Sequence, residues 1–152
     1  LNDANERFDV ITFWNVFDQL VDPCAALTLC RSIMQPEGFI FIRIPNSFFH
    51  QCAATFVRVM DRLGIKVFMK RNTFIFHRFS FSASVLRRLL RKYGFIRVVI
   101  RNGYPTAGDP YTVGAYLGVL KKLVYWCAEV VYFLTCGRVC LSSSLEVYVE
   151  HG

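Results

Sequence analysis

Two short apolar runs near the start of the chain are separated by an amphipathic stretch. The runs cover residues 8–14 and 39–44 and are rich in Val, Ile and Phe, which is typical of strands buried on both faces. Together with the stretch between them, they predict a βαβ unit with parallel strands and a right-handed crossover. The loops that follow Trp14 and Ile44 should therefore share one edge of the sheet, where open α/β sheets bind their ligands.

The stretch between the runs has the start and stop residues of a helix. Asp22 can cap the first turn, and Pro23 stands where its missing N–H does no harm. Pro36 and Gly38 are expected to end the helix. The sequence thus predicts one helix between the two parallel strands.

The rest of the chain continues with helices and strands. Its clearest helix is capped by Ser80 or Ser82, carries Arg and Lys opposite an apolar face, and ends at Gly94 in a left-handed cap. The last apolar run alternates strictly with polar residues, which indicates an antiparallel strand with one less buried face. The pattern predicts two further helices, at residues 53–63 and 113–135. It predicts strands at residues 95–100 and 145–150.

The composition is that of a folded domain with a basic surface. The 152 residues are 54% hydrophobic and 16% aromatic, which excludes a disordered chain. Lys and Arg number 18 against 11 acidic residues, and most of the net charge of +7 arises between residues 58 and 101. This excess fits a solvated helix face or attraction to a phosphorylated substrate or an acidic lipid surface. No nucleic-acid-binding motif accompanies it, so no nucleic acid partner is predicted.

The cysteines and the start of the chain bear on the cellular location. The six cysteines form no CxxC pair and no metal-ligand spacing with the three histidines. We interpret them as small core residues in a reducing, cytoplasmic compartment, with a disulfide between Cys136 and Cys140 as the alternative. Residues 1–7 are polar and contain no cleavable signal. Because the first strand starts soon after Leu1, we expect that an N-terminal part of the domain is missing.

Two segments could contact a membrane surface. In the helix at 113–135, Lys121, Lys122 and Glu129 would each cost roughly 2.5–3.5 kcal/mol inside a bilayer, so packing on the domain or lying at a bilayer interface is favoured over spanning. The basic amphipathic stretch at 47–69 could be a plain surface helix, cover a substrate entrance or lie on a membrane. The inner face of the membrane is thus an alternative location to the cytoplasm.

Polar residues gather in loops at the predicted sheet edge. The loop at 15–21 carries the densest polar groups and is the first candidate for ligand contact. Asn46 follows the second strand at the same edge, after a proline that also serves as a strand stop. His77 and Arg78 lie in an aromatic and basic loop from which they could reach a substrate, although a lone His is also a common structural hydrogen-bond partner.

Four stretches together resemble one enzyme family. They are FDVITFWNVFDQLVDP, QPEGFIFIRIPN, HRFSFSASVLRRLLRKYGF and the closing LSSSLEVYVEHG. In this set and at this spacing they are similar to class I methyltransferases that use S-adenosylmethionine, in the branch of ubiquinone-pathway O-methyltransferase-like domains. The resemblance covers essentially the whole chain.

The resemblance implies an α/β, Rossmann-like methyltransferase fold of which this chain is the C-terminal half. Residues 8–46 would be the family's fourth strand, helix and fifth strand, and the closing strand would lie antiparallel between its two predecessors. Residues 1–152 would belong to one domain, with 47–79 and 102–135 as cap or peripheral elements. The family's glycine-rich cofactor loop has no counterpart here, so its contacts would come from the missing N-terminal half.

The resemblance also implies roles for residues at the end of the first strand. Phe13, Trp14 and Asn15 would border S-adenosylmethionine, with Asn15 near its amino-acid end. Asp18 and Gln19 occupy the catalytic positions where many members carry a glutamate-histidine pair. A glutamine can only form hydrogen bonds, whereas Asp18 could act as a base or orient the substrate. One carboxylate among these residues does not predict a metal site.

Two functions follow from the resemblance. The first is S-adenosylmethionine-dependent methyl transfer to a small-molecule or lipid-like acceptor, with Asn46, His77, Arg78 and Tyr104 as substrate-binding residues. The second is a non-catalytic methyltransferase-like module for binding or membrane contact, which the loss of the glutamate-histidine pair favours. The sequence does not name the acceptor.

Overall fold

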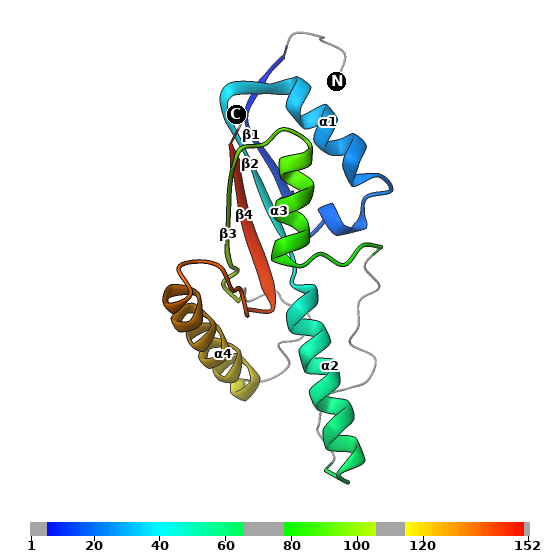
Figure 1. Ribbon diagram of the computed structural model, residues 1–152, viewed down its shortest axis with the longest axis vertical. Coiled ribbons are helices and arrows are strands. Elements are labelled where there is room, and N and C mark those ends of the chain that lie inside the picture. Colours follow the sequence, from blue (N-terminus) through cyan, green and yellow to red (C-terminus); the bar gives the residue numbers. More distant parts are fainter. Residues whose placement is uncertain (1–5, 66–77, 106–114, 151–152) are drawn as a thin grey trace.

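The structure is a computed structural model that describes residues 6–65, 78–105 and 115–150. Four strands in this part of the chain form one mixed sheet: β1 (Phe8–Trp14), β2 (Met34–Pro45), β3 (Arg97–Asn102) and β4 (Ser144–Glu150). Their order across the sheet is β1-β2-β4-β3 (Figure 1). β1 and β2 are parallel, and β4 runs antiparallel to both of its neighbours, which confirms the predicted position of the closing strand.

The helices lie on one face and at one end of this sheet. They are α1 (Pro23–Ile33), α2 (Ser47–Arg62), α3 (Ala83–Lys92) and α4 (Ala115–Leu134), with a short 3-10 turn η1 (Phe17–Gln19) after β1. α1 and α3 cover the sheet, whereas α2 projects beyond its end (Figure 1). The core forms where apolar side chains of α1 and α3 meet the inward positions of the strands: Leu27, Cys30, Leu86, Leu90, Ile40, Ile42, Ile44, Val147 and Val149.

The caps predicted for α1 and α3 are present. The Asp22 carboxylate accepts hydrogen bonds from the N–H groups of Cys24 and Ala25, both at 2.9 Å, at the start of α1. Ser82, rather than Ser80, caps α3. Gly94, with φ of +86°, follows the end of that helix in the left-handed region.

Three predicted boundaries are wrong. α1 ends at Ile33, and Pro36 and Gly38 lie within β2 instead of ending the helix. α2 begins at Ser47 rather than at residue 53, because the preceding asparagine caps it. β3 begins at Arg97 rather than at 95.

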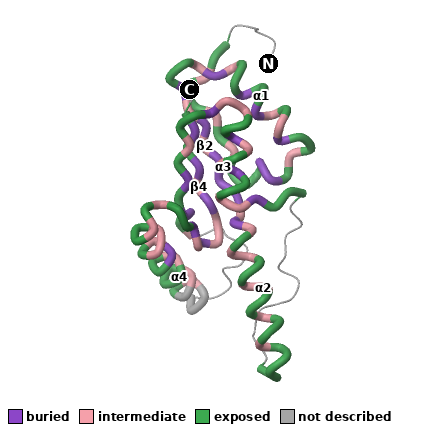
Figure 2. Tube along the Cα trace, viewed as in Figure 1, coloured by how far each residue is buried: buried purple, intermediate pink, exposed green. Residues whose placement is uncertain are grey.

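The first strand is not buried on both faces. Val10 and Trp14 are 46% and 55% exposed, and β1 is an edge strand of the described sheet. Buried positions gather instead on the central strands β2 and β4 (Figure 2). β4 shows the expected alternation, with buried and more exposed residues in turn. A continuous apolar run therefore did not reveal that helices of the described chain cover only one face of β1.

The six cysteines are all free thiols, so the alternative disulfide between Cys136 and Cys140 is not formed. Cys30 and Cys140 are buried, as expected for small core residues. Cys52, Cys127 and Cys136 are exposed, so the core interpretation is wrong for these three. Cys52 and Cys127 lie on exposed sides of α2 and α4, and Cys136 lies in the turn after α4.

Candidate functional site

The strand ends meet at one edge of the sheet, as predicted. We call this edge the rim and define it by residues 14–21, 45–46, 102–105 and 140–144. The N–H of Asn46 donates to the carbonyl of Ser143 (3.0 Å), and that of Gly103 donates to the carbonyl of Ser144 (2.8 Å). Backbone hydrogen bonds thus hold loops from three strands in fixed positions.

The turn after β1 is held by its own polar groups. Asn15 has φ of 55°, a left-handed conformation that Asn tolerates better than most residues. Its N–H donates to the carbonyl of Arg43 at 2.9 Å, and its carbonyl accepts from the Gln19 amide at 3.0 Å. Gln19 therefore stabilises the turn that presents Asn15 at the surface.

Phe13 and Trp14, the two aromatic residues predicted to border the cofactor, point to opposite faces of the sheet. Trp14 is 55% exposed, and its ring lies 5.4 Å from that of Phe41 on the neighbouring strand. Phe13 packs against the core, and its ring lies edge-to-face with that of Phe17, with the ring centres 5.4 Å apart. Only Trp14 offers its ring on the uncovered face, so only it is placed to adjoin a ligand there.

The two predicted catalytic residues differ in exposure. Asp18 is 2% exposed in the turn η1, whereas its neighbour Gln19 is exposed. The Asp18 carbonyl accepts a hydrogen bond from the N–H of Phe79 at 2.9 Å, which ties the β1 loop to the segment before α3. The Asp18 backbone thus joins two loops, and the residue is buried where they meet.

Asn46 has a structural position at the rim. It is 1% exposed, and its amide donates to the carbonyls of Cys140 and Ser142, both at 3.0 Å. Its side-chain oxygen accepts from the N–H of Phe48 at 3.2 Å and thereby caps α2. Its amide donors and its acceptor are thus used within the fold.

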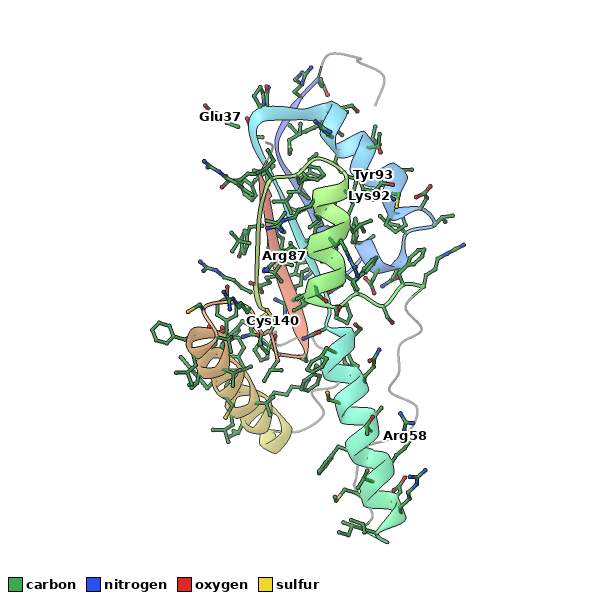
Figure 3. The ribbon with its side chains drawn as sticks, in the orientation of Figure 1. Glu37, Arg58, Arg87, Lys92, Tyr93 and Cys140 are labelled. Carbon is green, nitrogen blue, oxygen red and sulfur yellow. The ribbon has the colours of Figure 1, made fainter. Side chains whose placement is uncertain are left out.

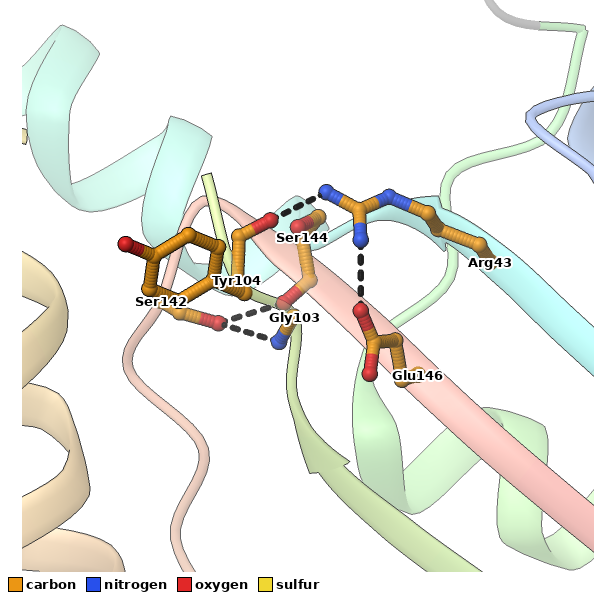
Figure 4. A network of polar contacts seen from close by, with 6 residues as sticks. All are labelled: Arg43, Gly103, Tyr104, Ser142, Ser144 and Glu146. Carbon is orange, nitrogen blue, oxygen red and sulfur yellow. Dashed lines mark hydrogen bonds and ion pairs between the residues drawn. The ribbon is translucent and has the colours of Figure 1, made fainter. Parts of the chain in front are cut away.

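A buried arginine links the elements of the rim. Arg43 on β2 forms an ion pair with Glu146 on β4 at 2.5 Å and donates to the carbonyl of Tyr104 at 2.5 Å (Figure 4). Its guanidinium carbon also lies 5.3 Å from the centre of the Trp14 ring, within range of a cation–π interaction. The sequence carried a signal for this cluster, because a lone Arg interrupts the apolar run FIFIRIP and a Glu interrupts the closing strand.

The turn into β4 closes the rim beside this cluster. The Ser142 hydroxyl donates to the carbonyl of Ser144 and accepts from the N–H of Gly103 at 3.1 Å (Figure 4). The Asn102 side-chain oxygen accepts from the N–H of Ser142 at 3.1 Å. A side chain at Gly103 would meet the Ser144 side chain, which explains the glycine.

The remaining predicted substrate residues differ in their positions. Tyr104 is 48% exposed, and its ring lies edge-to-face with that of Tyr125 on α4, with the ring centres 5.1 Å apart. Burial, followed by the nearby Glu129 carboxylate, raises the pKa of Tyr125. Arg78 is exposed before α3, and His77 lies outside the described residues. Within the part of the chain that the structure describes, no group of three His, Cys, Asp or Glu could hold a metal ion.

Comparison with family models identifies the chain. Residues 1–98 match the family described as "Methyltransferase domain". The chain belongs to this methyltransferase domain family. The match covers β1, β2 and the helices α1 to α3, and therefore includes the turn at Asn15. No curated protein matches the sequence of the chain.

Solved methyltransferase structures share the fold of this methyltransferase domain. An S-adenosylmethionine-dependent methyltransferase from Thermotoga maritima is 14% identical with a TM-score of 0.54, and one from Archaeoglobus fulgidus is 16% identical with a TM-score of 0.50. They match 100% and 96% of this chain and 59% and 60% of their own. A methyltransferase from Haloferax volcanii, solved with the Trm112 methyltransferase activator, is 13% identical with a TM-score of 0.51 over 100% of this chain and 58% of its own.

These matches show a class I methyltransferase fold. The domain spans about 60% of the length of the solved chains, so it corresponds to part of the fold. The predicted α/β, Rossmann-like topology is thereby confirmed.

Proposed function

We propose that this chain forms one wall of the cofactor site of an S-adenosylmethionine-dependent methyltransferase. Membership of the methyltransferase domain family supports this, and the observation that carries it is the fixed presentation of Trp14 and Asn15 at the rim. We place the protein in the ubiquinone-pathway O-methyltransferase-like branch, with residues 1–152 as the C-terminal part of one domain. The glycine-rich loop would then belong to the N-terminal part of the same domain.

Trp14 and Asn15 fit a cofactor with an adenosine and an amino-acid end. The exposed indole offers an apolar face, and the exposed Asn15 amide offers a donor and an acceptor. Arg43 and Gln19 hold these two residues by the cation–π contact and the amide hydrogen bond. When bound, S-adenosylmethionine supplies the methyl group, and the protein supplies position and orientation. Phe13 supports this wall from the core side.

The acceptor side of the proposed site is formed by residues 47–79 and 102–135. We propose that Arg78 and Tyr104, which are exposed, contact a small-molecule or lipid-like acceptor together with His77. Asn46 is left out of this set because its amide is used within the fold. Asp18 is only 2% exposed, so we propose that a proton released by the acceptor passes to another group or to water.

Calorimetric titration of S-adenosylmethionine into the full-length protein tests this proposal. We expect binding with a dissociation constant in the micromolar range, which Trp14→Ala weakens by about tenfold or more because the indole contact is lost. Val10→Ala is the matched control, because Val10 is 46% exposed on the same strand and lies away from the rim. Absence of heat at millimolar cofactor would refute the proposal, and an equal effect of both substitutions would remove Trp14 from the site.

A non-catalytic module is the second candidate function. The observation that favours it is the burial of Asp18 beside the exposed Gln19, which leaves an amide rather than a base on the exposed side of the turn. Such a protein would bind the cofactor or its product with no methyl transfer to any acceptor. Turnover assays with labelled S-adenosylmethionine and extracts of small molecules and lipids separate the two functions, since only an enzyme releases labelled product.

A further inference from the structure

The helix α4 turns an apolar face outward. Six large apolar side chains on it are more than half exposed: Val119 (59%), Leu123 (58%), Trp126 (64%), Val130 (57%), Phe133 (83%) and Leu134 (74%). Successive members are mostly three or four residues apart, which places them on one side of the helix. Ordinary surface helices bury such a face against the core. In this helix the apolar face, here called the outer face, is the one that lies away from the domain.

The opposite side of α4 fixes this orientation with polar contacts. The Asn102 amide donates to the carbonyl of Ala128 at 3.1 Å and to the Glu129 carboxylate at 2.9 Å. The Tyr132 hydroxyl donates to the carbonyl of Ile100 at 3.1 Å. Ala128, in the middle of this side, is only 2% exposed. The outer face is therefore held outward by specific bonds to the end of β3.

The charges around the outer face are positive. Lys122 lies beside it on the helix and is exposed, and Arg138 is exposed in the turn that follows. Glu129 is the acidic residue of α4, and it is engaged by Asn102. This arrangement complements an anionic surface.

A second basic and apolar surface lies at the same end of the sheet. α2 projects from the end of the sheet at which α4 also lies, and Arg58 lies on the part of α2 remote from the sheet (Figures 1 and 3). Phe56 on α2 and Leu63 at its C-terminal cap are 56% and 65% exposed, and Arg58 and Arg62 are exposed with them. Two helices at one end of the molecule thus combine exposed apolar side chains with cations.

We propose that the outer face of α4 docks on the surface of a bilayer that contains anionic phospholipid, with the helix axis parallel to the membrane. Among the described residues, no helix is both long and apolar enough to cross a bilayer, so the contact is interfacial. Trp126 suits this position, because an indole favours the boundary between headgroups and acyl chains. A helix that pairs with another helix buries a narrow stripe of two positions per heptad. The outer face is wider than such a stripe, because it also includes Leu134 and the exposed Cys127. The proposal does not depend on methyl transfer.

Flotation of the full-length protein with vesicles tests the proposal. Vesicles of equal parts phosphatidylcholine and phosphatidylglycerol should carry the protein, and pure phosphatidylcholine should carry much less. The double variant Trp126→Ser and Phe133→Ser should weaken binding by at least about tenfold. The matched control is Leu29→Ser with Ile96→Ser, because these residues are 58% and 70% exposed elsewhere on the molecule. Its binding should equal that of the wild type.

A fluorescence measurement locates the contact. The chain has two tryptophans, so Trp14→Phe leaves Trp126 as the reporter. Lipids brominated along the acyl chain should quench its emission in the mixed vesicles, and added salt should reduce the quenching through screening. Three results would overturn the proposal: flotation of the double variant equal to the wild type, no quenching of Trp126, or a dimer in sedimentation that the double variant disrupts while vesicles bind neither protein.

Discussion

Arg43 and Glu146 face each other across β2 and β4 and form an ion pair at 2.5 Å. Their side chains are 5% and 19% exposed, so the pair is largely shielded from water. The same arginine donates to the carbonyl of Tyr104 and lies over Trp14. Two proposed ligand-binding residues from distant parts of the chain therefore depend on one buried cation.

Glu146→Gln should destabilise the protein strongly. The substitution keeps the shape of the side chain but leaves the Arg43 guanidinium buried without its counter-charge. We expect the free energy of unfolding to fall by about 3 kcal/mol, near the lower end for broken buried pairs because Glu146 is partly exposed. Chemical denaturation in urea measures the change.

The matched control lies on the same sheet. Arg97 and Glu150 form an ion pair at 3.2 Å, but their side chains are 79% and 55% exposed. Glu150→Gln should therefore change the free energy of unfolding by no more than about 0.5 kcal/mol. Similar losses for both glutamine variants would show that shielding of the Arg43 pair does not contribute.

The elements that depend on local chemistry could be predicted from the sequence. Asp22 and Pro23 start α1 and Gly94 ends α3, because caps and left-handed turns need particular residues at particular positions. The alternation of the closing strand likewise showed its antiparallel place. These features require no knowledge of residues far along the chain.

The roles that depend on distant residues could not be predicted in this way. Asn46 was expected to contact substrate, yet its amide meets the carbonyls of Cys140 and Ser142, which lie more than ninety residues away along the chain. The direction of α4 depends similarly on Asn102, which binds the polar side of the helix. An apolar pattern gives a helix its two faces, but only the contact partner decides which one turns outward.

Asn46→Asp should separate the two structural roles of this residue. Aspartate can still cap α2, but it brings an oxygen instead of a donor to the carbonyls of Cys140 and Ser142. We expect a loss of about 2 kcal/mol or more in the free energy of unfolding. Ser82→Ala is the control, because the Ser82 hydroxyl is a more exposed cap that accepts from the N–H of Val85 at 3.4 Å. Its loss should lower the free energy of unfolding by about 0.5–1 kcal/mol. If Asn46→Asp is as mild as the control, the amide contacts are dispensable.

The left-handed conformation at Asn15 predicts an unusual substitution pattern. Asn15→Gly should leave stability nearly unchanged, because glycine adopts φ of 55° without strain. Asn15→Val should lower the free energy of unfolding by about 1–2 kcal/mol, because a β-branched side chain opposes this conformation. Thermal unfolding of the two variants compares them directly. If Asn15 also contacts the cofactor, both should weaken its binding, since both remove the amide.

The buried thiols should report on burial through pH. Burial raises the pKa of Cys30 and of Cys140 from 9.0 to about 11. The folded state therefore holds both protons more tightly than the unfolded chain does. Their contribution to stability is complete below pH 9.0 and is lost as the pH rises towards about 11. Urea unfolding at successive pH values should show this decline, and it should be shallower for Cys30→Ala with Cys140→Ala.

Alkylation gives an independent measurement on the same thiols. At pH 8 the exposed Cys52, Cys127 and Cys136 should react with iodoacetamide, whereas Cys30 and Cys140 should react only when the protein opens. Mass spectrometry of peptides after a short exposure distinguishes the two groups. The Cys140 thiol donates a hydrogen bond to the carbonyl of Ile100, to which Tyr132 of α4 also donates. Release of α4 should therefore make Cys140 reactive before Cys30. Equal and rapid labelling of all five would contradict both the burial of the two thiols and the attachment of α4 to β3.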